Sequence, residues 1–419
     1  MQHLSLYPMS WVGVAHIYFL WIGAMLSNPQ KVSKNSISNR ESLCKLLRVS
    51  DEFLTSVLAL SQDERYSRKN SVMKAGGVER PIYNPHRFLR KLQKRINVAI
   101  FSNRYVVKWP HYIYGSIPNQ KNNDGYDSKD YVSCAGRHCG ARSLLKIDVS
   151  SFFDNVHQDI VYAIFKDFLS YSEEVSIILA DICCHNGHLV QGGLTSSYIA
   201  SLCLYDVEGR VVERLNRKGL TYTRLVDDIT ISSKTLGTDF TYALKVVGDM
   251  LVDKDLPINE GKARVFRTST EPLTVHGLRV SFDSPRLPSD EVRRIRAAVK
   301  NLESLAAEPG YRTTHDYRHD YNRCMGRVNK LHRVKHKQHI PLLRRLNEIR
   351  PLPSRRDVNR AKDMVARLER DFSSKRSTYW YRSRYYRVME RLTVLGRIYD
   401  KATDQLRMKL RALRPGFED

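Results

Sequence analysis

The sequence predicts an α+β fold in which helices cover a sheet. Short apolar runs typical of strands alternate with segments of helical apolar spacing between residues 143 and 255. From Pro288 onward the apolar spacing is helical throughout. The chain has 419 residues, of which 42% are hydrophobic, enough for two or three domains with sizeable cores.

The charge of the chain indicates a polyanionic partner. Lys and Arg together number 69 against 44 Asp and Glu, a net charge of +25, and 23 Tyr residues supply flat rings among these charges. Nucleic acid is the first candidate for such a surface, and a merely soluble basic surface is the alternative.

Residues 1–40 are predicted to form an N-terminal helix and a polar linker. The apolar stretch Trp11–Met25 is about fifteen residues long, whereas a membrane-spanning helix needs about twenty. It contains His16, and no basic segment precedes it as in a signal peptide. A buried or partner-docking helix is therefore favoured, and no stable membrane association is expected.

The next hundred residues are predicted to begin with two short helices between Glu41 and Leu60. A strand hairpin follows, with its turn at Gly76–Gly77, and it offers Lys74 and Arg80 together. A helix begins near His86, and the polar stretch 113–142 suits a surface loop.

The region after residue 142 holds the predicted sheet. A strand ends at Asp148 and leads through a tight turn into a helix, and a strand pair spans Leu220–Lys234. Pro351–Pro353 marks a boundary between helices. Three further helices are predicted, at Glu173–Cys184, Thr195–Asn216 and Thr241–Asp255.

The seven cysteines show no disulfide spacing, which indicates a reducing cytosol. Cys183–His188 and the pair Cys134 and Cys139 can be drawn as zinc sites. Neither offers two well-spaced pairs of ligands, so packing is favoured for both.

Adjacent carboxylates interrupt the strand pair. In RLVDDITIS the alternation breaks only at Asp227 and Asp228, where two strands meet in a hairpin. An Asp-containing turn is the plain alternative. Two neighbouring carboxylates repel unless a cation neutralises them, and Asp148 ends another strand that can reach the same sheet edge. Three such carboxylates suit a pair of Mg²⁺ ions and hence nucleotidyl transfer.

Several segments in order resemble the palm motifs of bacterial reverse transcriptases, those of retrons, group II introns and defence-associated systems. The upstream segment ERPIYNPHRFLRKLQ resembles their fingers motif, and the resemblance runs from about Arg40 to Pro351. The palm segments are KIDVSSFFD, VQGGLTSS, YTRLVDDITIS, LPINEGKARVF and VHGLRV.

The resemblance implies a right-hand polymerase with fingers, a ferredoxin-like palm and a helical thumb, followed by a basic helical extension. The expected bounds are 41–147 for the fingers, 148–286 for the palm with interleaved fingers elements, 287–352 for the thumb and 353–419 for the extension. The implied activity is RNA-directed DNA polymerisation.

Carried over by position, the resemblance implies that Asp148 and Asp227 bind two Mg²⁺ ions and that Asp228 supports them. Lys262 would protonate the pyrophosphate leaving group, and a solvated surface lysine is the alternative. Four residues would contact the incoming dNTP, namely Lys74, Arg80, Gln191 and Gly192.

Phe153 is implied to select the sugar, because an aromatic ring there occupies the space that a 2′-hydroxyl would need. Deoxynucleotides are therefore expected as substrates. The alternative is that Phe152 and Phe153 are both core residues. If they lie on a strand they point to opposite faces, so only one of them can face the core.

The segment 353–419 interleaves arginines with aromatic rings, a composition that suits single-stranded RNA. An alternative of equal weight is that the tyrosines form the face of a helix that packs on the thumb. The RNA-binding candidates are Tyr379, Trp380, Arg382, Arg384 and Tyr385.

Departures from the family pattern bear on its finer placement. Leu225-Val226 stands where most relatives have Tyr-Ala, and Val275-His276-Gly277 stands in place of Val-Thr-Gly. The change at Leu225 bears on fidelity and primer handling. The retron pattern of Asn-Ala followed shortly by His is not visible, and together with His276 this favours the defence-associated branch, its type 2 class among them, over true retrons. The expected partners are a structured noncoding RNA template, nascent cDNA and dNTPs, in the cytoplasm. An intron maturase and a catalytically idle RNA-binding protein are the alternatives.

Overall fold

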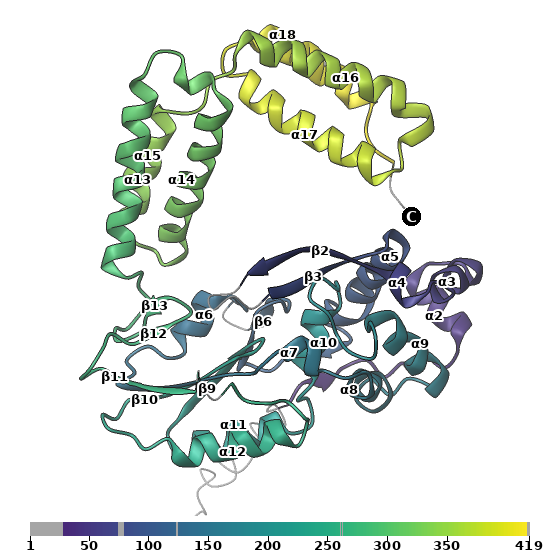
Figure 1. The fold of residues 1–419 in the computed structure, drawn as a ribbon, viewed down its shortest axis with the longest axis vertical. Coiled ribbons are helices and arrows are strands. Elements are labelled where there is room, and N and C mark those ends of the chain that lie inside the picture. The colour runs from purple at the N-terminus through teal and green to yellow at the C-terminus, as the bar shows by residue number, and fades with distance from the viewer. Residues whose placement is uncertain (1–27, 74–78, 123–124, 260, 262, 417–419) are drawn as a thin grey trace, which may run out of the picture. The chain divides into compact units, whose positions relative to one another are not determined.

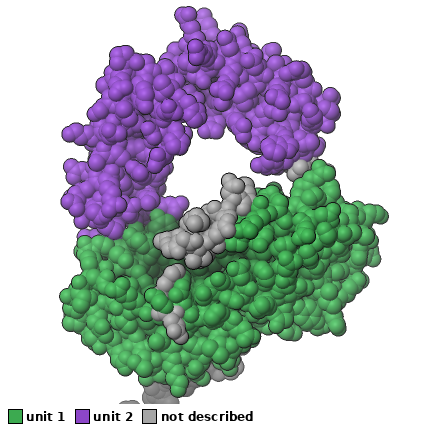
Figure 2. Space-filling view, viewed as in Figure 1, with its two compact units in different colours: residues 1–285 green, residues 286–419 purple. Residues whose placement is uncertain are grey.

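The computed structural model describes residues 28–73, 79–122, 125–259, 261 and 263–416. The chain divides into two compact units, residues 1–285 and 286–419 (Figures 1 and 2). The division lies one residue before the predicted start of the thumb. The apolar stretch Trp11–Met25 lies outside the described residues.

A five-stranded sheet forms the centre of the first unit, with strand order β11-β8-β10-β9-β5. Its neighbours pair antiparallel, except that β5 runs parallel to β9. The predicted α+β fold is confirmed. The strands are β5 (Ile113–Tyr114), β8 (Ser143–Asp148), β9 (Thr221–Leu225), β10 (Asp228–Ser233) and β11 (Arg264–Arg267).

Helices cover this sheet, because its apolar side chains require a buried face. The helices α11 (Glu208–Arg217) and α12 (Thr241–Val252) lie side by side along it (Figure 1). Ile147 on β8 and Ile231 on β10 are buried in the core that the sheet shares with the helices. The described part of the unit also holds four two-stranded sheets. Two of them pair β1 (Gln30–Lys31) with β4 (Val107–Lys108) and β12 (Thr274–Val275) with β13 (Leu278–Arg279), and the other two are hairpins described below.

The predicted fingers contain the hairpin of β2 (Tyr66–Met73) and β3 (Glu79–Pro85). As predicted, short helices precede it, and His86 caps the N-terminus of the helix after it. The helices are α2 (Arg40–Leu47), α3 (Asp51–Leu58), α4 (Gln62–Arg65) and α5 (Arg87–Ile96), the last continuing as a π-helical turn over Asn97–Phe101.

The expectation of a surface loop over 113–142 is wrong. This stretch holds β5, the hairpin of β6 (Gln120–Asn122) and β7 (Gly125–Asp127), and α6 (Tyr131–Gly136). One of its charged residues is buried and has partners inside the protein. Lys129 is 1% exposed, and its ammonium group donates to the Pro110 carbonyl at 3.1 Å and pairs with Asp127 at 2.9 Å.

The expected single helix over Thr195–Asn216 is two helices, α10 (Ser196–Leu202) and α11, separated by a turn. The preceding helices agree with the predicted positions after Asp148 and near Glu173. They are α7 (Phe152–Asn155), α8 (Gln158–Ala163), which continues as a π-helical turn over Ile164–Phe168, and α9 (Glu173–Cys183).

The second unit is helical, as predicted. Its first part holds α13 (Ser289–Ala307), a 3-10 turn (Tyr311–Thr313), α14 (His315–Arg333) and α15 (His339–Glu348). Its second part holds α16 (Arg355–Lys375), α17 (Tyr379–Leu395) and α18 (Asp400–Ala412), which share an apolar core of their own. Pro351–Pro353 lies between the two parts.

Candidate active site

Strand pairing brings two of the predicted site carboxylates together. In the antiparallel pair of β8 and β10, Asp148 and Asp228 are direct cross-strand partners. Side chains of such partners lie on the same face of a sheet. Asp227 directly precedes Asp228, in the two-residue loop that joins β9 to β10. All three aspartates thus lie at one edge of the sheet.

Backbone contacts hold this edge. The amide of Val149 donates to the Asp227 carbonyl at 3.3 Å, which joins the loop to the end of β8. The Asn259 amide donates to the Asp148 carbonyl at 2.8 Å, and the Asn259 side-chain amide donates to Asp148 Oδ2 at 3.4 Å. Asn259 therefore orients one candidate carboxylate.

A lysine and a histidine flank the exposed Asp228 carboxylate. Burial lowers the pKa of Lys146, while Asp228 acts in the opposite direction. His276 Nδ1 lies 3.9 Å from Asp228 Oδ2, and burial, aided by Lys146, lowers the pKa of His276 to about 4. His276 is therefore a neutral imidazole at pH 7, and Lys146 is the cation beside this edge.

The three carboxylates fit Mg²⁺ in their chemistry, because Mg²⁺ prefers hard oxygen ligands and keeps several waters. Their positions on adjacent strand ends also fit. In the part of the chain that the structure describes, however, no three His, Cys, Asp or Glu side chains gather closely enough to hold a metal ion. The pair of Mg²⁺ ions thus remains a prediction.

The loop with Gln191 and Gly192 docks on the fingers hairpin. The Tyr83 amide donates to the Gln191 carbonyl at 2.8 Å. Gly192 has a φ of 110°, and a Cβ atom there would lie 1.9 Å from the Tyr83 carbonyl oxygen. Glycine is therefore required because the backbone of Tyr83 lies so close to it. The predicted reason for this glycine was different, namely close contact of its backbone with a base pair. Arg80 lies in the same strand as Tyr83, opposite Val72.

Two predicted site residues, Lys74 and Lys262, lie outside the described residues. The side chain of Arg80 is likewise outside what the structure describes. Their roles toward the triphosphate and the leaving group stay predictions.

Phe152 and Phe153 begin helix α7 and do not lie on a strand, so the expectation of opposite strand faces is wrong. Ser151, with a φ of 42°, turns the chain between β8 and α7. Phe152 is 2% exposed in the core, and Phe153 is partly buried beside it, with ring centroids 6.1 Å apart. Phe153 thus remains the candidate for sugar selection.

One of the five RNA-binding candidates is corrected. Tyr385 is 7% exposed, within the core of α16–α18, and cannot stack on a base. Arg384 donates to Asp371 Oδ2 at 2.5 Å, and its RNA contact stays a prediction. Tyr379, Trp380 and Arg382 are exposed on α17.

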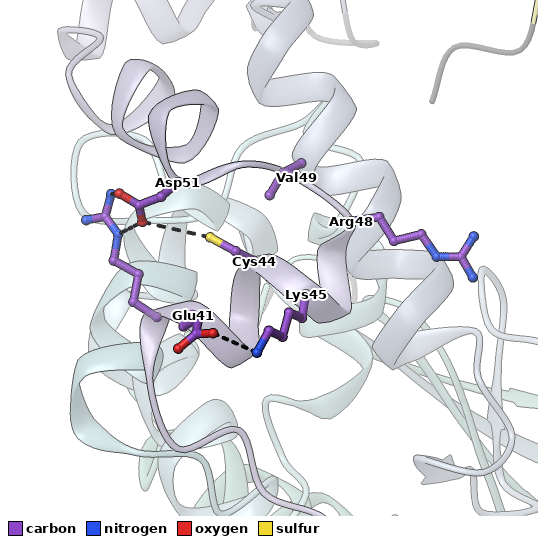
Figure 3. A pocket seen from close by; sticks show the side chains of 7 residues that line it. Glu41, Cys44, Lys45, Arg48, Val49 and Asp51 are labelled. Carbon is purple, nitrogen blue, oxygen red and sulfur yellow. Dashed lines mark hydrogen bonds and ion pairs between the residues drawn. The ribbon is translucent and has the colours of Figure 1, made fainter.

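A pocket of about 380 Å³ lies in the predicted fingers, between helices α2 and α3 (Figure 3). Four of its five charged residues form two ion pairs, Arg40 with Asp51 at 2.5 Å and Lys45 with Glu41 at 2.6 Å. It contains none of the predicted site residues. The pairing indicates that the pocket's charges stabilise α2 and α3.

Sequence reasoning missed Arg224, which is 1% exposed and pairs with Glu208 directly behind the aspartate loop. An available signal was the charge in the middle of an otherwise apolar strand, YTRLV. A buried arginine requires an acidic partner, which the pattern alone does not identify.

All seven cysteines are free thiols, and no helix among the described residues is both long and apolar enough to cross a membrane.

Comparison with known proteins gives consistent results. Residues 72–280 match the family described as reverse transcriptase (RNA-dependent DNA polymerase). The chain is 44% identical to the Retron Ec48 reverse transcriptase of Escherichia coli over 393 residues, covering 92% of this chain and 95% of that protein. It is 32% identical to the Retron Se72 reverse transcriptase of Salmonella heidelberg (strain 579083-10), covering 80% of this chain and 86% of that protein.

Among solved structures, the fold is similar to telomerase from Candida albicans in complex with a TWJ fragment of telomeric RNA. The TM-score is 0.39 at 10% identity, over 96% of this chain and 71% of that one.

Proposed function

Since the chain belongs to the retron reverse transcriptases and is an RNA-directed DNA polymerase, we propose that it copies a structured noncoding RNA into cDNA at Asp148, Asp227 and Asp228. The cross-strand pairing of Asp148 with Asp228, beside Asp227, carries this proposal. Two Mg²⁺ ions held there would stabilise the attacking and leaving oxygens of nucleotidyl transfer.

The family membership corrects the finer expectation that favoured the defence-associated branch over true retrons. The relatives at 44% and 32% identity are both retron reverse transcriptases. His276 in place of threonine, and the absence of a visible Asn-Ala pattern, are therefore variations compatible with retrons.

The incoming dNTP is proposed to lie between the fingers hairpin and the aspartate edge. Arg80 and Lys74 would hold its triphosphate, because guanidinium and ammonium groups donate to phosphate oxygens. Gln191 and Gly192 would border the nascent base pair, and the docking of their loop on β3 supports this by linking it to the hairpin. Lys262 would give a proton to the pyrophosphate as it leaves.

Phe153 would exclude ribonucleotides by filling the space of the 2′-hydroxyl. Its partly buried ring packs against the buried Phe152, which limits its movement and supports a steric role.

RNA binding is proposed for the helices after residue 353. Tyr379 and Trp380 are 66% and 74% exposed, and Arg382 is exposed one turn further along the same helix. Exposed rings stack on unpaired bases and arginines neutralise phosphates. The net charge of +25 supports a nucleic-acid partner for the chain as a whole.

A role in anti-phage defence in the bacterial cytoplasm is part of the same proposal. The cytoplasmic location is supported by seven free cysteines, which suit a reducing compartment.

The test of the catalytic proposal is primer extension with purified protein, its co-purifying RNA, Mg²⁺ and dNTPs. Asp227→Asn is expected to reduce DNA synthesis at least about a thousandfold, because the carboxylate charge is lost. Asp239→Asn is the control, since Asp239 bonds only locally to Thr241. Full synthesis by Asp227→Asn would refute the assignment.

The test of template and biological role uses the same pair of variants in cells. Sequencing the RNA and DNA that co-purify with the wild-type chain should give one structured RNA and its complementary DNA. The plating efficiency of phage should be lower on cells that carry the wild-type protein than on cells that lack it. On cells that carry Asp227→Asn it should return to the value without the protein. Equal plating on both strains would reject the defence role while leaving polymerase activity intact.

A further inference from the structure

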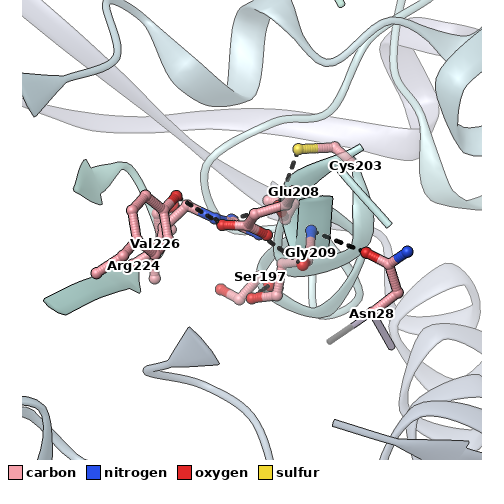
Figure 4. Close-up of polar contacts among 10 residues, drawn as sticks. Asn28, Ser197, Cys203, Glu208, Gly209, Arg224 and Val226 are labelled. Carbon is pink, nitrogen blue, oxygen red and sulfur yellow. Dashed lines mark hydrogen bonds and ion pairs between the residues drawn. The ribbon is translucent and has the colours of Figure 1, made fainter. Parts of the chain in front are cut away.

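Arg224 lies on β9, three residues before Asp227, and all five of its N–H donors are used. Its Nε and Nη2 donate to the two carboxylate oxygens of Glu208 at 2.6 and 2.7 Å. Nη2 also donates to the Ser201 carbonyl at 2.9 Å, and Nη1 donates to the carbonyls of Ala200 and Val226, each at 3.2 Å. The guanidinium group thus joins helix α10, helix α11 and the aspartate loop (Figure 4).

Glu208 is itself held on several sides. It is fully buried and also accepts a hydrogen bond from the Tyr222 hydroxyl at 2.8 Å. It is the first residue of α11, where a negative charge is favoured, and the Asn28 side chain accepts from the neighbouring Gly209 amide at 2.8 Å. Burial acts to lower the pKa of Arg224, but Glu208 outweighs it, so the pKa lies above the ordinary value.

The loop that Arg224 contacts is strained. Val226 has a φ of 61° in the two-residue loop between Leu225 and Asp228. Glycine is usual at a first loop position with positive φ, and a β-branched residue there is unfavourable. Arg224 fixes the Val226 carbonyl, and the Val226 side chain lies against Gly115, where a Cβ would be 3.1 Å from it. Together these contacts hold a conformation that valine would otherwise leave.

We propose that Arg224, oriented by Glu208, is a positioning residue that holds Asp227 in place for metal binding through the Val226 carbonyl. The inference rests on the proposed role of Asp227 as a metal ligand. In this arrangement the buried ion pair of Arg224 and Glu208 offsets the strain of valine at positive φ in the loop.

A second buried arginine provides a matched control. Arg65 is 4% exposed, pairs with Asp181 at 2.8 Å and donates to the carbonyls of Leu58 and Leu60. It resembles Arg224 in burial and in bonding, but its partners all lie in the fingers and in α9. Its replacement therefore reports the cost of disturbing a buried ion pair without moving the aspartate loop.

The experiment compares Arg224→Lys with Arg65→Lys. Lysine keeps the positive charge but cannot reach Glu208 and the Val226 carbonyl together, because it lacks the guanidinium fork. Three properties are measured: primer extension against Mg²⁺ concentration, Mn²⁺ binding to the enzyme–duplex complex by electron paramagnetic resonance, and duplex affinity without metal. Both variants are assayed below their melting temperatures.

For Arg224→Lys we expect kcat to fall about tenfold and the half-saturating Mg²⁺ and Mn²⁺ concentrations to rise severalfold, with duplex affinity unchanged. Arg65→Lys should lower the melting temperature without shifting either metal titration. Wild-type metal titrations for Arg224→Lys, or equal shifts in both variants, would overturn the inference. If Arg224→Lys does not fold, the same comparison uses Glu208→Gln against Asp181→Asn.

A second-site variant tests the role of loop strain. Val226→Gly adopts positive φ without strain, so it should restore at least about threefold of the lost kcat in the Arg224→Lys background. No restoration would refute the strain argument. The proposed function fails separately: if Asp227→Asn still made DNA, no metal role would remain for Arg224 to support. If Asp227→Asn loses activity but Arg224→Lys keeps the kcat and metal titrations of the wild type, only the positioning role is rejected.

Discussion

Replacing Gly192 with alanine tests the docking of the palm loop on the fingers hairpin. The new Cβ would lie 1.9 Å from the Tyr83 carbonyl oxygen, whereas such contacts are essentially never shorter than 3.0 Å. The two backbones must therefore separate by about 1 Å, which breaks the hydrogen bond from the Tyr83 amide to the Gln191 carbonyl.

The expected destabilisation has two parts. Alanine at a φ of 110° costs about 1–3 kcal/mol, and loss of the hydrogen bond costs about 1 kcal/mol, so a total near 3 kcal/mol is expected. Because the loop and hairpin are proposed to border the dNTP, the KM for dNTP should also rise. Equilibrium urea unfolding and dNTP titration in primer extension measure these effects.

Gly187→Ala is the control for the backbone cost. Gly187 has a φ of 80°, and nothing lies within 4 Å of a Cβ built there. This variant should lose only about 1–2 kcal/mol of unfolding free energy and should keep its KM for dNTP. If Gly192→Ala were no less stable than Gly187→Ala, the reasoning from the close approach would be refuted.

The remaining predictions concern pH, the C-terminal helices and the sugar. Burial lowers the pKa of His138 to about 3, whereas the unfolded chain binds a proton at this histidine below about pH 6.5. The free energy of unfolding should therefore decrease as the pH falls from about 6.5 to 3. In His138→Gln the urea midpoint should decrease less over the same pH range. Tyr385→Ala should cost about 3–5 kcal/mol of unfolding free energy, whereas the exposed Trp380→Ala should change stability by under about 0.5 kcal/mol and instead weaken RNA binding in a filter assay. The opposite pattern would return Tyr385 to the RNA surface. Phe153→Ala should raise ribonucleotide incorporation relative to deoxynucleotide at least about tenfold in single-nucleotide extension, and an unchanged ratio would remove Phe153 from sugar selection.

The sheet was predictable because its signals are local. Alternation in the segment around Asp227 and Asp228 identified a hairpin, and the apolar run before Asp148 identified a strand. The structure adds the register, which depends on long-range packing. That register makes Asp148 and Asp228 partners.

Elements that depend on distant polar partners were less predictable. Lys129 looks like a surface residue in a polar stretch, but carbonyls some twenty positions away satisfy its ammonium group. The break between α10 and α11 places Glu208 at a helix start facing Arg224, and no local breaker residue marks it.

The burial of Tyr385 could have been predicted from the spacing of apolar residues along the helix. Tyr381, Tyr385, Val388, Leu392 and Leu395 recur every three or four residues and form the buried face of α17. Composition drew attention to the rings as a group, whereas periodicity separates the buried ones from Tyr379 and Trp380.

The pairing of β8 with β10 also restricts how this chain can change length. Side chains alternate between the two faces of a strand, so one residue inserted within either strand would turn the following residues to the other face and separate Asp148 from Asp228. Insertions and deletions should therefore accumulate in connections such as Leu236–Asp239, beyond the end of β10, and be eliminated by selection between Ser143 and Asp148.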